Sequence, residues 1–305
     1  MENRIMHLRK PKPNNHLPHN KNKHRGFFLS MLALLLVAAF LHFFEDTSHR
    51  GTQPDENEIV VTFLDVGQGD SIVIRSRDNA VLIDGGEFSQ RDVVLGYLRE
   101  AGIRRLCFVV ATHPHSDHIG SLGTVLGRME VGALIMPDRT NNTIAFEALL
   151  ESIESNNIPV TFPDPGYRLK AGIIDLTVLA PHDAGASNLN NASIVTRLEH
   201  GETSFLFTGD AEAESEAAMV SGGMKIESNV LKVGHHGSRT STTKSFLDRV
   251  NPSVAVISVG TGNNFGHPNE EVVAQLESAG IAVYRTDKHG TIQMVTNGRQ
   301  IFMLE

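Results

Sequence analysis

The sequence predicts an α/β protein that follows a single long apolar segment near the N-terminus. Beyond residue 57, runs typical of strands alternate with runs typical of helices, as expected for an α/β fold. The two halves of this region also echo one another, which predicts two related units whose strand ends meet. The apolar segment, residues 27–44, contains only two polar side chains, Ser30 and His42.

The N-terminal segments predict a membrane anchor. Residues 1–26 are basic and rich in Pro and Asn, so we expect a disordered tail. Residues 27–44 would span roughly 27 Å as a helix, close to the hydrocarbon thickness of a bilayer. We expect an uncleaved signal anchor, with a cleaved signal peptide as the alternative. The Lys and Arg residues before the apolar segment predict that the tail is cytoplasmic and that the domain over 58–305 lies outside the cytoplasm, at the cell membrane. Residues 45–57 are polar and predict a linker between the two.

The first half of this domain begins with a β-rich hairpin around the turn "GQGD". A helix follows and is closed by Gly102, and a later strand leads into a group of histidines. The expected strands are the hairpin 58–76 and the runs 79–86, 106–118, 132–137 and 175–181. The expected helices are 89–103, a segment from about Gly120, and 144–157.

The second half repeats this order of elements. A hairpin with a His200-Gly201 turn ends in "FTGD", a helix follows, and the next strand ends in "GHHGS". The expected strands are the hairpin 192–210 and the runs 228–238, 254–260 and 291–296; the expected helices are 211–220, 244–251 and 269–280.

Composition excludes several classes of function. A single cysteine, Cys107, permits neither an internal disulfide nor a zinc site built on thiolates. Residues 51–305 hold 19 basic and 32 acidic side chains, a balance of −13. Such a domain lacks the broad basic surface of a general nucleic-acid binder, so phosphate recognition would have to be local, through metal ions.

The stretch "HPHSDH" is a strong candidate for metal binding. Imidazole and carboxylate are ligands for Zn²⁺ and Mn²⁺. His113 and His115 are two residues apart and point the same way in extended backbone, whereas Asp117 and His118 begin the next helix and face another side. One loop can therefore offer two ligands to each of two ions.

Two ions close together need a bridging anion and a further imidazole. Asp210, at the end of "FLFTGD", is the candidate bridge. In "LKVGHHGS", strand alternation puts His235 on the inward side, so we expect His235 as the ligand and His236 beside the substrate.

These motifs together resemble the metallo-β-lactamase superfamily. More narrowly, "FLDVGQGDSIVI", "LIDGG", "THPHSDHIGSL", "SFLFTGD", "LKVGHHGS" and "FGHPNEEVVAQL" are similar to the hydrolase domain of ComEC-type competence proteins. The resemblance covers roughly residues 58–300. It implies a four-layer αββα sandwich with two divalent metal ions, Zn²⁺ or Mn²⁺. The implied ligands are His113, His115, Asp117, His118, Asp210 and His235.

The sequence departs from that pattern in two places. Where many members of the superfamily have a further histidine ligand, this chain has "NLNNASIV", so Asn190 or Asn191 stands there. His182 is near in sequence, but we expect a solvated loop residue. ComEC-type proteins also carry many membrane helices, whereas this chain has one predicted span and cannot form a channel by itself.

Several other residues have both a functional and a simpler interpretation. In the superfamily, an aspartate at the place of Asp84 orients the metal loop, although a plain turn residue would look the same. Gln68 and Asp70 lie at a hairpin tip that the resemblance puts near the metals, or they form an ordinary Gly-rich turn. Ser238, with Arg239 beside it, would hold a phosphate oxygen. His267 would contact the substrate or the leaving group, or simply flank a helix.

The predicted function is a membrane-anchored, metal-dependent hydrolase. Metal-bound hydroxide would attack the substrate, with Asp117 taking a proton and His236 or His267 protonating the leaving group. We expect a phosphodiesterase or nuclease acting on a phosphodiester substrate such as single-stranded DNA. The alternatives are a cell-surface phosphodiesterase for wall or lipid head groups, resembling phosphorylcholine esterases, and a non-catalytic accessory module. Thiolesters and β-lactams also remain open, because a fold does not fix the chemistry.

Overall fold

The computed structural model describes residues 53–182 and 187–304. The predicted tail, the predicted membrane span 27–44 and most of the predicted linker lie outside these residues. Within the described part of the chain, no helix has the length and apolar character that crossing a membrane requires.

Eight strands form the first sheet. They are β1 (Ile59–Phe63), β2 (Ile72–Arg75), β3 (Ala80–Ile83), β5 (Phe108–Val110), β7 (Leu134–Ile135), β8 (Val160–Thr161), β16 (Ile292–Thr296) and β17 (Ile301–Leu304). Their order is β17-β16-β1-β2-β3-β5-β7-β8. Neighbours from β17 to β3 are antiparallel, and those from β3 to β8 are parallel. The late strand β16 therefore pairs with the first strand, β1, with Ile59 opposite Thr296.

Seven strands form the second sheet. They are β9 (Arg168–Ala171), β10 (Ile174–Ala180), β11 (Val195–His200), β12 (Thr203–Phe207), β13 (Val230–Lys232), β14 (Val254–Ile257) and β15 (Ala282–Arg285). Their order is β15-β14-β13-β12-β11-β10-β9. The pairs from β9 to β12 are antiparallel and those from β12 to β15 are parallel. A separate parallel pair joins β4 (Arg105–Leu106) to β6 (Glu130–Val131).

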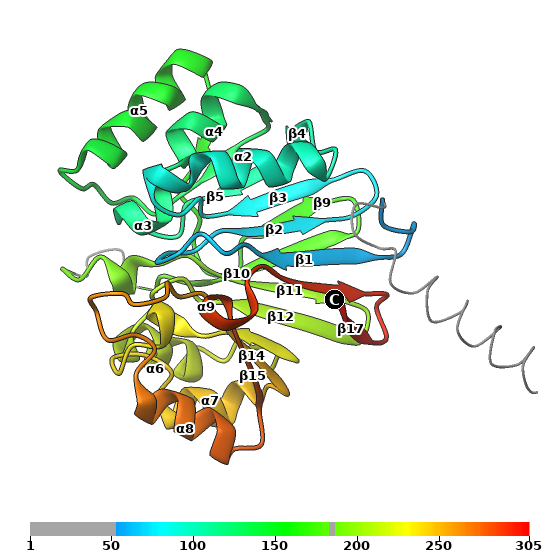
Figure 1. The fold of residues 1–305 in the computed structure, drawn as a ribbon, viewed down its shortest axis with the longest axis vertical. Coiled ribbons are helices and arrows are strands. Elements are labelled where there is room, and N and C mark those ends of the chain that lie inside the picture. Colours follow the sequence, from blue (N-terminus) through cyan, green and yellow to red (C-terminus); the bar gives the residue numbers. More distant parts are fainter. Residues whose placement is uncertain (1–52, 183–186, 305) are drawn as a thin grey trace, which may run out of the picture. The chain divides into compact units, whose positions relative to one another are not determined.

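Helices cover the outer face of each sheet (Figure 1). The first sheet carries α2 (Arg91–Glu100), α3 (Ser116–Ile119), α4 (Leu122–Arg128) and α5 (Ile144–Asn156). The second carries α6 (Ala213–Ser221), α7 (Lys244–Val250) and α8 (Glu270–Ser278), with the short α9 (Thr286–His289) after β15. The described residues also form the 3₁₀ turns η1 (Phe88–Gln90), η2 (Asn190–Ala192) and η3 (Gly234–Gly237).

Three apolar cores hold these layers together. Alternate residues of β1 point between the sheets, where Phe63 lies 6.2 Å from Phe207 of β12, measured between ring centroids. Behind the first sheet, Leu82 packs in one cluster with Leu98 of α2, and behind the second, Leu206 packs in one cluster with Phe246 of α7. Because both faces of the sheets are covered, the central strands are buried along their whole length.

This arrangement is the αββα sandwich that the resemblance implied, but the sequence analysis missed the outermost strands of both sheets and the two-residue strand β6. The outermost strands are β8, β9, β15 and β17. Edge strands are short and partly exposed, so their apolar pattern is weak. The predicted strand over 106–118 is also shorter, because the backbone leaves β5 at Val110 and forms a loop and α3.

Candidate metal centre

The first part of the site is the loop between β5 and α3. This loop starts near Thr112 and carries His113 and His115, and α3 carries Asp117 and His118. His113 and His118 are fully buried, whereas 25% of the Asp117 side chain is exposed. The predicted ligand group is therefore mostly enclosed, with Asp117 on the side open to solvent.

The second part of the site follows β12, in the turn that ends at Asp210. Gly209 has a φ of +52°, and a Cβ at this position would lie 3.0 Å from Thr112 of the first loop. The backbone N–H of Asp210 donates to Ser193 Oγ at 3.1 Å. The buried Asp210 carboxylate thus meets the histidine loop, and the two halves converge as predicted.

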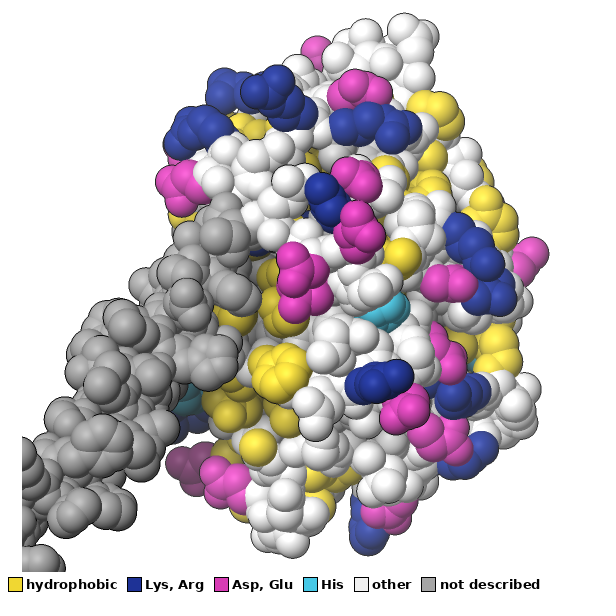
Figure 2. All heavy atoms as spheres, turned by 90° about the vertical axis from the view of Figure 1, so that its right-hand side faces the viewer, with side chains coloured by type: hydrophobic (Ala, Val, Ile, Leu, Met, Phe, Trp, Pro, Cys, Tyr) yellow, Lys and Arg dark blue, Asp and Glu magenta, His cyan; other side chains and the backbone are white. Residues whose placement is uncertain are grey.

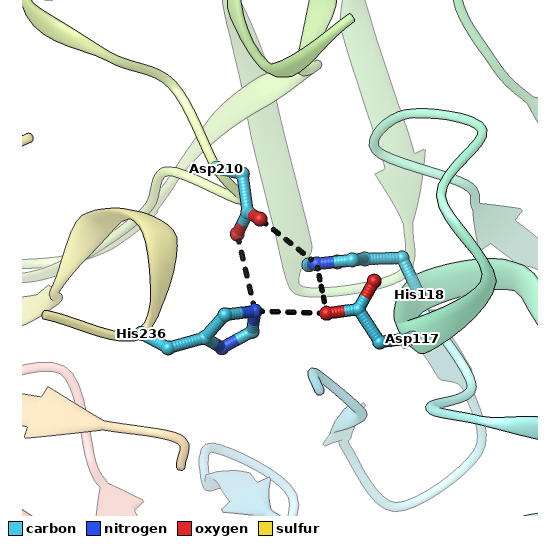
Figure 3. Close-up of side chains that lie close together, drawn as sticks. All are labelled: Asp117, His118, Asp210 and His236. Carbon is cyan, nitrogen blue, oxygen red and sulfur yellow. Dashed lines mark ion pairs between the residues drawn. The ribbon is translucent and has the colours of Figure 1, made fainter. Parts of the chain in front are cut away.

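Four side chains from the two halves form a compact quartet: Asp117, His118, Asp210 and His236 (Figure 3). Each offers one ligand atom, and these atoms lie within 4.8 Å of one another. His236 Nε2 lies 3.2 Å from Asp117 Oδ2 and 3.6 Å from Asp210 Oδ1. His118 Nε2 lies 3.3 Å from Asp210 Oδ2 and 3.8 Å from Asp117 Oδ2.

The quartet has the chemical character of a cation site. His118 Nε2, His236 Nε2 and Asp210 Oδ1 are all buried and have no hydrogen-bond partner. Buried polar atoms without a partner are costly, and they need a specific explanation. Two imidazole nitrogens and two carboxylates facing one another match the donor set that Zn²⁺ and Mn²⁺ accept. The residues therefore fit a divalent ion.

His113 and His115 lie next to the quartet, beside His118 and Asp210. His113 Nε2 is 3.7 Å from Asp210 Oδ2 and 2.9 Å from His115 Nδ1. The ring of His113 is also 4.2 Å from that of His118, measured between centroids. The Asp210 carboxylate therefore has nitrogen atoms of His113, His118 and His236 within 4 Å, as expected for a carboxylate that two ions could share.

The charges of the site favour a bound cation. Burial opposes the charged form of His236, yet the carboxylates of Asp210 and Asp117 raise the pKa of His236 to about 10. The pKa of His118 also lies well above its usual range, because Asp210 and Asp117 outweigh burial. His113 behaves in the opposite way: burial and the adjacent His118 hold its pKa well below the usual range. The carboxylates thus attract positive charge, which a metal ion would supply in place of protons.

Asp84 lies directly behind His118. One of its oxygens accepts hydrogen bonds from the Thr112 hydroxyl at 2.7 Å and lies 2.8 Å from His118 Nδ1, and the other accepts from the Thr112 backbone N–H at 2.8 Å. This contact directs the free Nε2 of His118 toward the quartet. The geometry supports the orienting role over the plain turn residue.

A buried ion pair lies behind His236. Lys232 Nζ is 2.8 Å from Asp70 Oδ2, and Asp70 Oδ1 is 3.4 Å from His236 Nδ1. His236 Nδ1 also lies 2.9 Å from the carbonyl oxygen of Ser258. The sequence analysis missed Lys232, although a lysine inside the apolar run "NVLKVG" was a usable signal.

The structure corrects the predicted order of the two adjacent histidines. His236, rather than His235, enters the quartet. The prediction extended strand alternation through "VGHH", but β13 ends at Lys232 and both histidines have positive φ, 47° and 53°. His235 instead has its Nδ1 3.2 Å from Glu212 Oε1 and its Nε2 3.7 Å from Asp210 Oδ2.

The two asparagines in the place of the further histidine face glutamates. Asn190 Nδ2 donates to Glu212 Oε1 at 2.9 Å, and Asn191 Nδ2 donates to Glu214 Oε2 at 3.3 Å. Asn191 Oδ1 accepts from the Glu212 backbone N–H at 3.0 Å. Their amides therefore hold the segment after Asp210. Sequence reasoning missed Glu212, although it stands only two residues after that aspartate.

The remaining predicted residues lie at different distances from the quartet. His267 is close, with its ring 5.3 Å from that of His235 and 6.3 Å from that of His236. Gln68 contacts the segment before His267 by accepting from the Gly260 backbone N–H at 3.2 Å. The hairpin tip thus contacts the segment that leads to His267.

Ser238, Arg239 and His182 make their contacts outside the quartet. Ser238 Oγ lies 3.0 Å from Thr240 Oγ1, and the exposed Arg239 pairs with Glu271 at 3.5 Å. His182 is exposed, as predicted, and lies beside Gly222 at the end of α6. Arg239 therefore points toward α8, so the structure gives no direct support for its phosphate contact.

Comparison with known proteins extends these observations. The family model of the metallo-beta-lactamase superfamily matches residues 64–261. Among curated proteins, ComE operon protein 3 of Bacillus subtilis is 32% identical over 251 residues, covering 76% of this chain and 32% of that protein. Competence protein ComA of Neisseria gonorrhoeae is 32% identical over 271 residues, covering 88% of this chain and 36% of that protein. The chain thus spans about a third of the length of these relatives.

Solved structures share the fold at low sequence identity. The metallo-beta-lactamase fold protein YhfI of Bacillus subtilis has a TM-score of 0.53 at 12% identity, covering 77% of this chain and 99% of that one. The diiron β-hydroxylase CmlA of Streptomyces venezuelae also has a TM-score of 0.53, at 15% identity, covering 83% of this chain and 55% of that one. The fold alone therefore does not select a reaction.

Proposed function

This chain belongs to the metallo-β-lactamase superfamily of metal-dependent hydrolases, and from that premise we propose that it hydrolyses phosphodiester bonds, with single-stranded DNA as the first candidate substrate. The observation that carries the proposal is the buried quartet, in which three ligand atoms lack hydrogen-bond partners. Buried polar atoms of this kind are costly unless a bound ligand satisfies them.

The ligands divide into two groups around one carboxylate. Asp117, His118 and His236 would hold one ion, His113 and His115 would hold the other, and Asp210 would contact both. When bound, two divalent ions would supply hydroxide near neutral pH and would stabilise the negative charge that develops on the oxygens of the attacked phosphate. Asp84, Asp70 and the Ser258 carbonyl hold the imidazoles in place from behind.

Asp117 and His267 are the side chains best placed to act on the substrate. Asp117 is partly exposed and would accept a proton from the attacking water. Burial and the neighbouring His235 and His236 lower the pKa of His267, so its ring is neutral at neutral pH. We therefore assign His267 to substrate contact rather than to protonation of the leaving group.

The choice of substrate is supported by the relatives and by the chemistry of the site. The matching relatives include two proteins named for competence and a third named recombination protein 2, of Haemophilus influenzae, 32% identical over 240 residues. These names point toward DNA. An acidic domain would recognise phosphate through its metal ions, which this centre is suited to hold. Anchorage in the membrane through residues 27–44, with the domain outside the cytoplasm, remains part of the proposal.

The test is a substrate panel on the purified full-length protein. With Mn²⁺ or Zn²⁺, it should hydrolyse bis(p-nitrophenyl) phosphate and a single-stranded oligonucleotide, and Asp210→Ala should abolish both reactions. His182→Ala, a histidine outside the site, is the matched control and should remain active. Cleavage of phosphorylcholine esters alone would favour the head-group alternative. A wild-type protein that purifies without metal and cleaves nothing would contradict the proposal.

A further inference from the structure

We propose that Phe265 is a stacking platform for a nucleobase next to the scissile phosphodiester. This inference rests on the proposed function and adds a specificity-determining residue to it. Phe265 is 69% exposed, and it belongs to the segment between β14 and α8. A single exposed phenylalanine is common on protein surfaces, so the argument depends on what its ring contacts.

A row of aromatic rings connects Phe265 to the quartet. The Phe265 ring stacks on that of His267, with 5.9 Å between centroids and 23° between planes. His267 in turn lies 6.3 Å from His236, whose Nε2 is a ligand atom of the quartet. Phe265 is therefore separated from the candidate metal ligands by one ring, and it presents its remaining surface to solvent.

The loop that carries Phe265 is held in a defined conformation. Asn263 Oδ1 accepts hydrogen bonds from the backbone N–H groups of Phe265 and His267, each at 3.1 Å. Asn263 Nδ2 donates to the carbonyl oxygen of Gly260 at 3.0 Å. A Cβ on Gly260 would lie 2.5 Å from the backbone nitrogen of Gln68, so this loop also packs tightly against the hairpin tip. A ring held in this way loses little entropy when a ligand stacks on it.

The acidic charge of the domain makes contacts with the bases important for binding DNA. Residues 51–305 have a balance of −13, and on the face shown in Figure 2 the Lys and Arg side chains are interspersed with Asp and Glu. Long-range attraction of a polyanion is therefore weak, and affinity must come from contacts near the metal centre. Stacking on an aromatic ring binds any nucleobase, because every base has a flat π-face.

The experiment compares two oligonucleotides on the full-length, Mn²⁺-loaded protein. One is a thymidine oligomer, and the other has the same backbone with abasic sites in place of the bases. Phe265→Ala should raise the KM for the base-bearing oligomer about ten-fold and leave the abasic oligomer unchanged. Phe265→Trp should restore the wild-type KM. Phe302→Ala removes an exposed phenylalanine from the edge strand β17 and should change neither reaction.

Binding measurements separate failure of this inference from failure of the proposed function. Fluorescence anisotropy gives the Kd of both oligomers without requiring cleavage. If the wild-type protein cleaves neither oligomer but binds the base-bearing one about ten-fold more tightly, in a way that Phe265→Ala removes, the stacking role stands and the nuclease function falls. Equal Kd values for the two oligomers, or equal losses on both in Phe265→Ala, would overturn the stacking role.

Discussion

Lys232 and Asp70 form a fully buried ion pair that joins the two halves of the domain, with 2.8 Å between Lys232 Nζ and Asp70 Oδ2. Lys232 ends β13 of the second sheet, and Asp70 lies in the hairpin turn that precedes β2 of the first. Lys232 Nζ also donates to the Val233 carbonyl oxygen at 2.9 Å. The ammonium group thus supplies a fixed positive charge behind His236, and Asp70 can carry its charge without water.

Replacing one partner of this ion pair should lower the free energy of unfolding far more than replacing both partners. We expect Lys232→Met to lower the free energy of unfolding by about 3–5 kcal/mol, because it leaves the charged Asp70 in the interior without its ammonium partner. The double variant Asp70→Asn with Lys232→Met should recover most of this loss. Urea denaturation of the metal-free protein measures both.

Lys244 provides the control for that measurement. It pairs with Asp248 on the surface, where both side chains are more than half exposed, and Lys244→Met should change the free energy of unfolding by less than about 1 kcal/mol. If the double variant Asp70→Asn with Lys232→Met is no more stable than Lys232→Met alone, the charge left on Asp70 is not the cause of the lost stability.

The two adjacent histidines should differ in their effect on metal affinity. His236→Ala removes a ligand atom of the quartet and should weaken Mn²⁺ binding by more than about 100-fold, beyond the usual cost of losing a residue behind a ligand. His235→Ala should have a smaller effect, because His235 lies mainly against Glu212. Isothermal titration with Mn²⁺ measures the difference, and a larger loss in His235→Ala would restore the order expected from strand alternation.

Asp84 should matter for metal binding although its carboxylate is directed at His118 Nδ1 rather than into the quartet. Asp84→Ala frees the His118 ring to rotate, and we expect Mn²⁺ affinity to fall by about 10- to 100-fold. Asp138→Asn, at an exposed position, is the matched control and should bind Mn²⁺ like the wild type. An Asp84→Ala protein with unchanged affinity and a lower melting temperature would assign Asp84 to loop stability alone.

The metal-free protein should lose stability as the pH rises from 6.5 to about 10. The pKa of His236 in the folded state is about 10, above its ordinary value of 6.5, so proton binding stabilises the folded state fully below pH 6.5. That contribution is lost as the pH rises through the folded-state value.

Asp210 affects stability at acidic pH, because His118 and His236 hold its pKa well below 3.8 despite burial. Its contribution is present above pH 3.8 and is lost on acidification. Urea midpoints recorded with a chelator from acidic to alkaline pH should therefore be highest between pH 3.8 and pH 6.5. Equal midpoints at about pH 6 and pH 9 would contradict the assignment of protons to the site.

The sequence by itself determined the α/β class, the loop that brings four ligand candidates together, and Asp210 as their partner from the other half, whereas the four-layer αββα arrangement was implied by the resemblance to the superfamily. The first three features depend on local patterns: continuous apolar runs for strands buried on both faces, apolar spacing for helices, and several metal-binding side chains within six residues. Edge strands such as β9 and β17 carry no such pattern, because their surroundings are partly solvent.

Only the tertiary structure decided which of His235 and His236 enters the quartet, and that Lys232 neutralises Asp70. The first depends on two positive φ angles after β13, which residue type does not dictate. The second depends on a contact between residues 162 positions apart in the chain, and a long-range contact exists only once both sheets have packed. The same packing brings Phe265 within one ring of the site, because it places the segment before α8 beside the ends of strands from both halves.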